Sequence, residues 1–229
     1  MISRLIAVLV LAVSLPLGAC AVKPMTDQER AHQLVQGAQL TYKKFKASKD
    51  EPMDEFRKLL PKAQGMIILP GVVKGGFVLA AEGGSGVLLA KDDAGNWSQP
   101  AFYFLASGSV GFQLGAQVGD VVVLLFSQDA VKAIIDNQGK LGADLNLVVG
   151  TVGAGVEAST TTNVGADVMA FTQGTGLFAG GALEAAALIK RNDFAKAFYG
   201  QMVEPQEIVF GGAVQNPATE PLRALLAAQ

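Results

Sequence analysis

The spacing of hydrophobic residues changes twice along this 229-residue chain. Near the N-terminus the apolar residues are continuous, from Leu5 to Val13. Between residues 26 and 60 they recur every three or four positions, which is typical of amphipathic helices. From residue 64 onwards, short apolar runs alternate with Gly, Asp, Asn and Ser, which is typical of β-strands joined by turns. The pattern therefore predicts an apolar leader, two helices and then a sheet.

Both N-terminal helices carry recognisable start signals. Thr26 is followed three residues later by Glu29, the spacing of a capping box, and predicts a helix that ends near Ser48. Asp50-Glu51-Pro52 predicts a second helix that reaches Leu60, because proline is tolerated in the first helical turn. The apolar stripe of the first helix comprises Ala31, Leu34, Val35, Ala38, Tyr42 and Phe45.

Eight segments beyond residue 64 have the composition of short strands. Asp92-Asp93-Ala94-Gly95-Asn96 predicts a hairpin loop between two of them. Helices are expected after Ser127, with Val131, Ile134 and Ile135 inside, and at residues 194–199 and 222–227, whereas residues 182–190 suit a strand or a helix. The expected strands are residues 66–69, 75–81, 86–91, 101–107, 111–118, 121–126, 145–149 and 164–171.

These elements predict an α+β fold. Short strands with few helices between them favour an antiparallel sheet, barrel-like or strongly curved, flanked by N- and C-terminal helices. The 27 glycines suit bent strands, and a 50% hydrophobic content with 17% charged residues indicates a folded domain. Residues 21–62 hold nine basic and six acidic side chains, whereas residues 63–229 hold eight and fourteen. This acidic remainder argues against nucleic acid as a partner.

The N-terminus has the organisation of a secretory signal. Arg4 precedes the apolar run, which is too short for the roughly 20 residues of a transmembrane helix. Leu17-Gly18-Ala19-Cys20 resembles the lipobox of bacterial lipoproteins, and Cys20 is the single cysteine, so no internal disulfide can form. The resemblance implies a cleaved signal peptide (residues 1–19), acylation of Cys20 by palmitate-type chains, a lipidated tether (residues 20–26) and one domain (residues 27–229). Ala21 in place of Asp implies the periplasmic face of the outer membrane.

The chemistry of the sequence argues against an enzyme. His32 is the only histidine and is expected on the solvated surface. No residues have the spacing of zinc ligands, and the sequence argues against a hydrolase triad, since only His32 could serve as its base. Ser85 and Ser109 lack the spacing of a nucleophile elbow. Gly153-Ala154-Gly155-Val156-Glu157-Ala158 has a dinucleotide-binding spacing, but a helix-poor segment follows it. We expect no cofactor and no metal.

Four lysines and two aromatic residues stand together near the end of the first helix. Such a helix can lie in a headgroup region with its rings inserted and its lysines on phosphates. Alternatively, the rings pack on the domain and the lysines form a solvated face. Trp97 presents the same choice between a membrane-interface anchor and a ring packed on the sheet. The candidate lipid-binding residues are Tyr42, Lys43, Lys44, Phe45, Lys46 and Lys49.

An ordered set of motifs resembles the SYLF domain family, known from eukaryotic actin-patch adaptors and bacterial lipoproteins. The resemblance covers roughly residues 53–212. Its most specific parts are Trp97-Ser98-Gln99-Pro100 and Gly174-Thr175-Gly176-Leu177-Phe178-Ala179-Gly180. The other matching segments are Gly65-Met66-Ile67-Ile68, Lys74-Gly75-Gly76-Phe77, Gly84-Ser85-Gly86-Val87, Gly111-Phe112-Gln113-Leu114-Gly115, Glu184 and Phe198-Tyr199-Gly200.

The resemblance implies a non-enzymatic lipid-binding module. Eukaryotic members associate with phosphoinositide membranes through an N-terminal amphipathic helix, which corresponds here to residues 26–49. Where those members carry a Gly-Pro pair and an Arg, this chain has Gly150-Thr151-Val152-Gly153-Ala154, so anionic phospholipid is the expected ligand. We do not expect actin as a partner in a bacterial envelope. The alternative is an envelope interaction protein that binds another protein and contacts the membrane only through its acyl chains.

Overall fold

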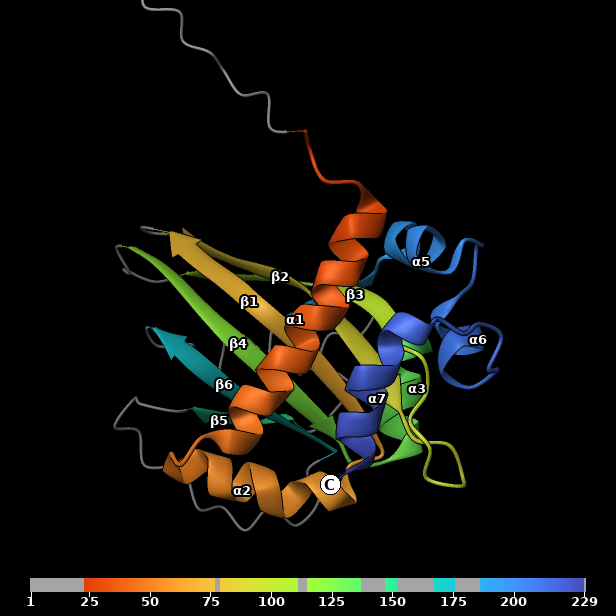
Figure 1. Cartoon of the computed structure of the whole chain (residues 1–229). Helices are drawn as coiled ribbons and strands as arrows, with labels where there is room; N and C mark the ends of the chain where they lie inside the picture. Colours follow the sequence, from red (N-terminus) through yellow and green to blue (C-terminus); the bar gives the residue numbers. More distant parts are fainter. Residues whose placement is uncertain are drawn as a thin grey trace, which may run out of the picture.

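The computed structural model describes residues 23–76, 79–110, 115–136, 147–151, 167–175 and 186–228. Within these ranges, two helices precede the sheet in the chain, one lies between two of its strands, and three follow it (Figure 1). The helices are α1 (Asp27–Ala47), α2 (Glu51–Leu59), α3 (Gln128–Asp136), α5 (Asn192–Tyr199), α6 (Pro205–Val209) and α7 (Glu220–Ala227), with short 3-10 turns η1 (Leu60–Lys62) and η2 (Pro217–Thr219). The strands are β1 (Gly65–Gly76), β2 (Leu79–Ala90), β3 (Ala101–Val110), β4 (Gly115–Leu125), β5 (Leu147–Thr151), β6 (Val168–Thr175) and β7 (Ala187–Lys190).

The strands form one sheet in the order β5-β6-β4-β1-β2-β3-β7. Neighbouring strands are antiparallel, except that β5 runs parallel to β6. The predicted α+β class and flanking helices are therefore confirmed. The sequence predicts a sheet that is either barrel-like or strongly curved. The described strands make an open sheet with β5 and β7 at its edges, so the barrel does not form among them.

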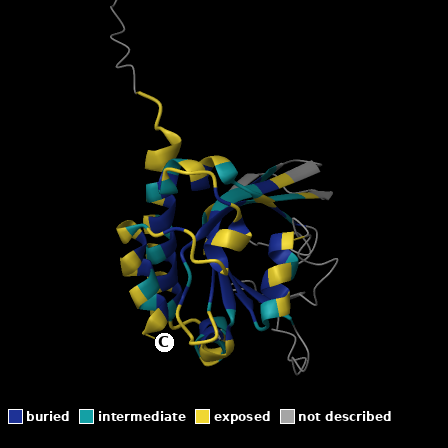
Figure 2. Cartoon of the chain, turned by 90° about the vertical axis from the view of Figure 1, so that its right-hand side faces the viewer, coloured by how far each residue is buried: buried dark blue, intermediate teal, exposed yellow. Residues whose placement is uncertain are grey.

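Helix α1 crosses one face of this sheet diagonally, and α7 lies beside it (Figure 1). Helix α3 lies on the other face, so the buried residues concentrate in the strands between the two layers (Figure 2). Both faces of the central strands are covered, which explains why their sequences are continuous apolar runs instead of alternating ones. Residues 66–69 of β1 and 121–125 of β4 are fully buried.

An aromatic cluster joins the two N-terminal helices to the sheet. The Phe56 ring of α2 lies 5.7 Å from Phe45 and 6.5 Å from Tyr42 on α1, and 5.2 Å from Phe171 on β6, measured between ring centroids. Edge-on aromatic pairs of this kind contribute about 0.5–1.5 kcal/mol each beyond their buried area. Every residue of the described core lies between Ala31 and Leu226. A chain that begins at Lys23 therefore keeps this whole core.

Several predicted strand boundaries are wrong because the strands continue through residues that were expected to end them. Strand β1 continues through Pro70 and Gly71, where a bulge interrupts the pairing and Gly71 adopts a φ of 63°. A bulge accommodates a proline that a regular ladder would exclude. The predicted strand at 75–81 is therefore the end of β1 and the beginning of β2.

Likewise, the predicted strands at 111–118 and 121–126 belong to one strand, β4, whose described part starts at Gly115. Residues 182–190, which suit either element by sequence, contain strand β7. The hairpin loop at Asp92–Asn96 is confirmed: Gly95 has a φ of 83°, and the Asp92 N–H donates to the Asn96 carbonyl. The short helix α6 was not predicted.

Candidate functional site

Helix α1 starts and ends where its sequence predicts. Thr26 and Glu29 form the expected capping box, since the Glu29 N–H donates to Thr26 Oγ1 and the Thr26 N–H donates to Glu29 Oε2. Ser48 is the C-cap residue, and its N–H donates to the Lys44 carbonyl. This capping fixes the length of α1, so Lys44 and Lys46 lie in the last turn of a 21-residue helix and Lys49 follows its C-cap.

The two aromatic candidates for lipid contact point into the core. Tyr42 and Phe45 are both fully buried and pack against Phe56. Burial raises the pKa of the Tyr42 hydroxyl to about 12, so this group stays neutral. Of the two alternatives that the sequence leaves open for these rings, the structure has the one in which they pack on the domain. The amphipathic stripe of α1 contacts the sheet and α2 instead.

The four lysines occupy different environments. Lys43 and Lys49 are exposed. Lys44 donates from Nζ to Asp120 Oδ2 on β4 at 2.7 Å, and its side chain remains 51% exposed. Lys46 donates from Nζ to the carbonyl oxygen of Ala228, just after α7, at 2.6 Å. The structure therefore leaves Lys43 and Lys49 as the cations of this helix end that face solvent, with Lys44 partly accessible.

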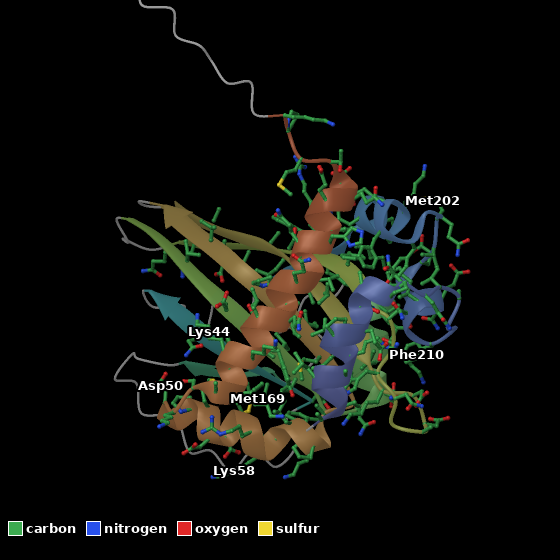
Figure 3. All side chains as sticks on the ribbon, in the orientation of Figure 1. Lys44, Asp50, Lys58, Met169, Met202 and Phe210 are labelled. Carbon is green, nitrogen blue, oxygen red and sulfur yellow. The ribbon has the colours of Figure 1, made fainter. Side chains whose placement is uncertain are left out.

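A hollow lies beside Lys44, between α1 and the strands β4 and β6. Its volume is about 440 Å³, and it is open to solvent. Asp120 lines the hollow and is held by two hydrogen bonds. Its Oδ1 accepts from the Gly71 N–H at 2.9 Å, and its Oδ2 accepts from Lys44 Nζ. Figure 3 shows Lys44 and Asp50 near the same end of α1. The residues that line the hollow are Lys44, Val118, Gly119, Asp120, Gln173 and Gly174.

Sequence reasoning missed Asp120 and Gln173. The prediction placed Gly119-Asp120 in a break between two strands, where an aspartate is unremarkable. In the structure both residues lie within strands, where Asp120 and Gln173 are directly opposed on β4 and β6. The usable signal was the single acidic residue inside the long apolar run of residues 118–126, since charged side chains are rare in buried strands unless they are paired.

The other candidate residues have structural roles or lie outside the described residues. His32 does not lie free on the surface as expected: it is half-buried, and its ring packs at a tilt against Phe198 of α5, 4.7 Å between centroids. Trp97 is 2% exposed, which supports packing on the domain over the membrane anchor, and the Lys91 Nζ lies 5.2 Å from its ring centroid. Ser85 Oγ accepts from Arg191 at 3.5 Å. Cys20 and the glycine motif at 153–158 lie outside the described residues, and nothing is described of the Ser109 side chain.

A second pair of charges is buried in the sheet. Lys74 on β1 and Glu82 on β2 are register partners, and each is only 5% exposed. Burial raises the pKa of the Glu82 carboxyl, and the positive charge of Lys74 opposes that shift in part. No hydrogen-bond donor for either Glu82 oxygen occurs in the described residues. Neither residue lines the hollow beside Lys44, so they do not belong to the candidate surface.

The described ranges contain no group of three His, Cys, Asp or Glu side chains that could hold a metal ion. None of the helices there combines the length and apolarity needed to cross a bilayer. The fold and site so far define an α+β domain that presents a lysine-bearing helix end beside a polar hollow on an open sheet.

Comparison with known proteins identifies the family. Residues 106–229, more than half of the chain, match the family model described as "Ysc84: Las17-binding protein actin regulator". The chain is 36% identical over 169 residues to SH3 domain-containing YSC84-like protein 1 from Bos taurus and 34% identical to the Homo sapiens protein of that name. It is 33% identical over 171 residues to LAS seventeen-binding protein 3 from Saccharomyces cerevisiae.

These matches cover 73% of this chain, but 49% of each mammalian protein and 37% of the yeast protein. The chain therefore belongs to the Ysc84 family, which is the SYLF domain family that its motifs indicate. It spans about half the length of the mammalian relatives and less of the yeast one. The family description names binding and regulation of other proteins and no reaction.

Proposed function

We propose that this chain is a non-enzymatic, phospholipid-binding SYLF-domain lipoprotein, anchored through Cys20 to the periplasmic face of a bacterial outer membrane. The observation that carries the proposal is the end of α1, where Lys43 and Lys49 face solvent while the neighbouring rings are buried. Membrane contact at this end is therefore electrostatic, through ammonium groups on phosphates, without insertion of Tyr42 or Phe45. Lys44 adds a third, partly engaged cation, and Lys46 donates to the Ala228 carbonyl just after α7.

The tether constrains how these lysines reach a bilayer. From Cys20 to Asp27 the chain can extend at most roughly 25 Å. Helix α1, with 21 residues, is about 31 Å long, and Lys43 and Lys49 lie at the end away from the tether (Figure 1). A domain that stands on its tether with α1 upright keeps these lysines away from the headgroups. The proposal therefore requires α1 to lie along the membrane surface.

The expected affinity of the domain alone is modest. A basic side chain near an anionic surface contributes about 1 kcal/mol, and this contribution falls off within a Debye length of about 8 Å at physiological salt. The two exposed lysines and Lys44, which is paired with Asp120, are therefore expected to set the orientation of the domain on the membrane. They contribute little to the strength of its attachment. The holding force comes from the acyl chains of Cys20, since several chains together anchor a protein stably.

Sedimentation with vesicles tests this function. The chain from Lys23 onwards, which lacks the anchor, should sediment with vesicles that contain phosphatidylglycerol and not with pure phosphatidylcholine vesicles. Binding should weaken as salt is raised, because exposed charges are screened. Absence of binding to anionic vesicles at low salt, with the domain folded by circular dichroism, contradicts the proposal.

A second function has one specific observation in its favour. The family description and the name of the yeast relative both refer to binding of a protein partner. In an envelope this corresponds to an interaction protein whose membrane contact comes only from acyl chains. Cross-linking that recovers one dominant envelope protein, together with no vesicle binding by the anchor-free chain, favours this alternative.

A further inference from the structure

The hollow beside Lys44 contains two polar side chains from the sheet, Asp120 and Gln173, whose oxygens can accept hydrogen bonds. Asp120 and Gln173 are directly opposed across β4 and β6, so their side chains lie on the same face of the sheet. The Gln173 Oε1 atom is enclosed and has no hydrogen-bond donor among the described residues. Its Nε2 atom lies 3.5 Å from Asp50 Oδ2, which brings a second carboxylate to this end of the hollow. An enclosed acceptor without a donor costs about 1–3 kcal/mol, so a ligand that supplies N–H groups relieves it.

Lys44 supplies the opposite charge at the hollow. Its ammonium has three N–H donors, of which one reaches Asp120 Oδ2. The side chain is 51% exposed, so the remaining donors are accessible to an anion. Each Asp120 oxygen, although engaged by Lys44 or by Gly71, keeps a further lone pair for a second donor. The hollow can therefore hold an anion and a cation at once without breaking its ion pair.

An apolar strip continues from this polar end. Val118 lines the hollow and lies two residues before Asp120 on β4, so both side chains lie on the same face. Its register partner Val73 on β1 is beside it, and each valine is 48% exposed. The next residue across the sheet is Gly83, which has no side chain of its own, and the Phe104 ring lies close to the position that its Cβ would take. Leu40, one turn before Lys44 on α1, is 65% exposed.

We propose that this hollow binds one phospholipid molecule whose headgroup carries a primary amine, the phosphatidylethanolamine class. This inference rests on the proposed function and names its ligand. The headgroup phosphate accepts from Lys44, and the ammonium donates to Asp120 Oδ2 and, once the Gln173 amide turns towards the hollow, to Gln173 Oε1. An acyl chain lies along Val118 and Val73. A volume of about 440 Å³ suits a headgroup, and the exposed valines favour a lipid over a free zwitterion of the same chemistry.

The choice of amine follows from the donors. A trimethylammonium group has no N–H, so phosphatidylcholine cannot satisfy the enclosed Gln173 oxygen. Phosphatidylglycerol offers hydroxyl donors but no cation, and it places its single negative charge near Asp120 and Asp50. The exposed lysines respond only to the net charge of a headgroup. The hollow should in addition distinguish headgroups with a primary amine from those without one.

The test compares vesicles of equal charge. The chain from Lys23 onwards is titrated with vesicles of phosphatidylglycerol mixed with either phosphatidylethanolamine or phosphatidylcholine, at the same phosphatidylglycerol fraction. Binding is expected to be about tenfold tighter with phosphatidylethanolamine, as for one additional charge-assisted hydrogen-bonded contact. Asp120→Asn should remove most of this preference, although the asparagine oxygen still accepts from Gly71. Gln173→Met should reduce the preference while it keeps the side-chain length.

A matched variant and a soluble competitor complete the design. Asp93→Asn changes the net charge equally, but Asp93 is exposed in the hairpin loop, so the preference should persist. Soluble glycerophosphoethanolamine should compete only at concentrations far above those of the lipid, because it cannot use the valines. Competition as strong as that of the lipid overturns the lipid assignment.

The failure of this inference differs from the failure of the proposed function. Equal binding to both mixtures by the wild-type chain, or a preference unchanged in Asp120→Asn, overturns the headgroup site while binding to anionic vesicles still stands. Absence of binding to every mixture overturns both. Thermal unfolding of each variant, compared with wild type, shows whether a lost preference reflects the site or the fold.

Discussion

Replacing Phe56 by alanine is expected to lower the free energy of unfolding by about 3–5 kcal/mol. Phe56 is fully buried, and its ring contacts Tyr42 and Phe45 on α1 and Phe171 on β6. Its loss creates a cavity where α1, α2 and the sheet meet, and the surrounding rings can close it only in part. Typical domains are stable by about 5–15 kcal/mol, so this variant is expected to be marginal. Chemical denaturation followed by circular dichroism measures the change.

The matched control removes an exposed apolar side chain. Met202 is 63% exposed, so Met202→Ala should change the stability by no more than about 0.5 kcal/mol. A small effect of Phe56→Ala, comparable with that of Met202→Ala, contradicts the packing of α2 against α1. It also reopens the possibility that Tyr42 and Phe45 are available to a membrane.

Reversing two charges at the end of α1 is expected to abolish most vesicle binding. In Lys43→Glu/Lys49→Glu the two solvent-facing cations become anions, a change of four charge units at one site. At about 1 kcal/mol per charge near the surface, binding to phosphatidylglycerol vesicles should fall by at least tenfold at low salt. Both side chains are exposed, so the stability of the domain should be retained. Co-sedimentation over a range of lipid concentrations measures the loss.

The control makes the same charge change elsewhere. Lys132 on α3 and Lys196 on α5 are both exposed, and α3 lies on the opposite face of the sheet from α1. Lys132→Glu/Lys196→Glu should retain most of the wild-type affinity. If both double variants lose binding equally, net charge alone governs the interaction and the end of α1 is not a specific surface.

The sequence predicts α1 accurately because its signals are local. The capping residues Thr26 and Glu29 and the apolar spacing lie within the helix itself, and the structure has the helix end where Ser48 indicates. The same local pattern could not tell where the rings point. An amphipathic stripe with Tyr42 and Phe45 suits a core and a bilayer equally, and the deciding partner, Phe56, depends on how α2 folds back against α1.

The strand boundaries and the hollow depend on contacts that sequence spacing does not contain. Pro70 and Gly119-Asp120 have the local signature of chain breaks, yet long strands pass through both because neighbouring strands pair on either side of these positions. Lys44 and Asp120 are 76 residues apart in the chain, and Gln173 comes from a third element. Only the order β6-β4-β1 and the crossing of α1 bring these side chains together.

The orientation of the domain on a vesicle tests the central claim most directly. The chain from Lys23 onwards contains no cysteine, so a single environment-sensitive fluorophore can be attached at Ala47→Cys or at Met202→Cys. Both positions are exposed: Ala47 lies beside the lysines, whereas Met202 follows α5, away from them (Figure 3). Nitroxide-labelled lipids should quench the fluorophore at residue 47 and leave residue 202 largely unquenched. Equal quenching at both positions, or stronger quenching at residue 202, would contradict the claim that the lysine-bearing end of α1 faces the bilayer.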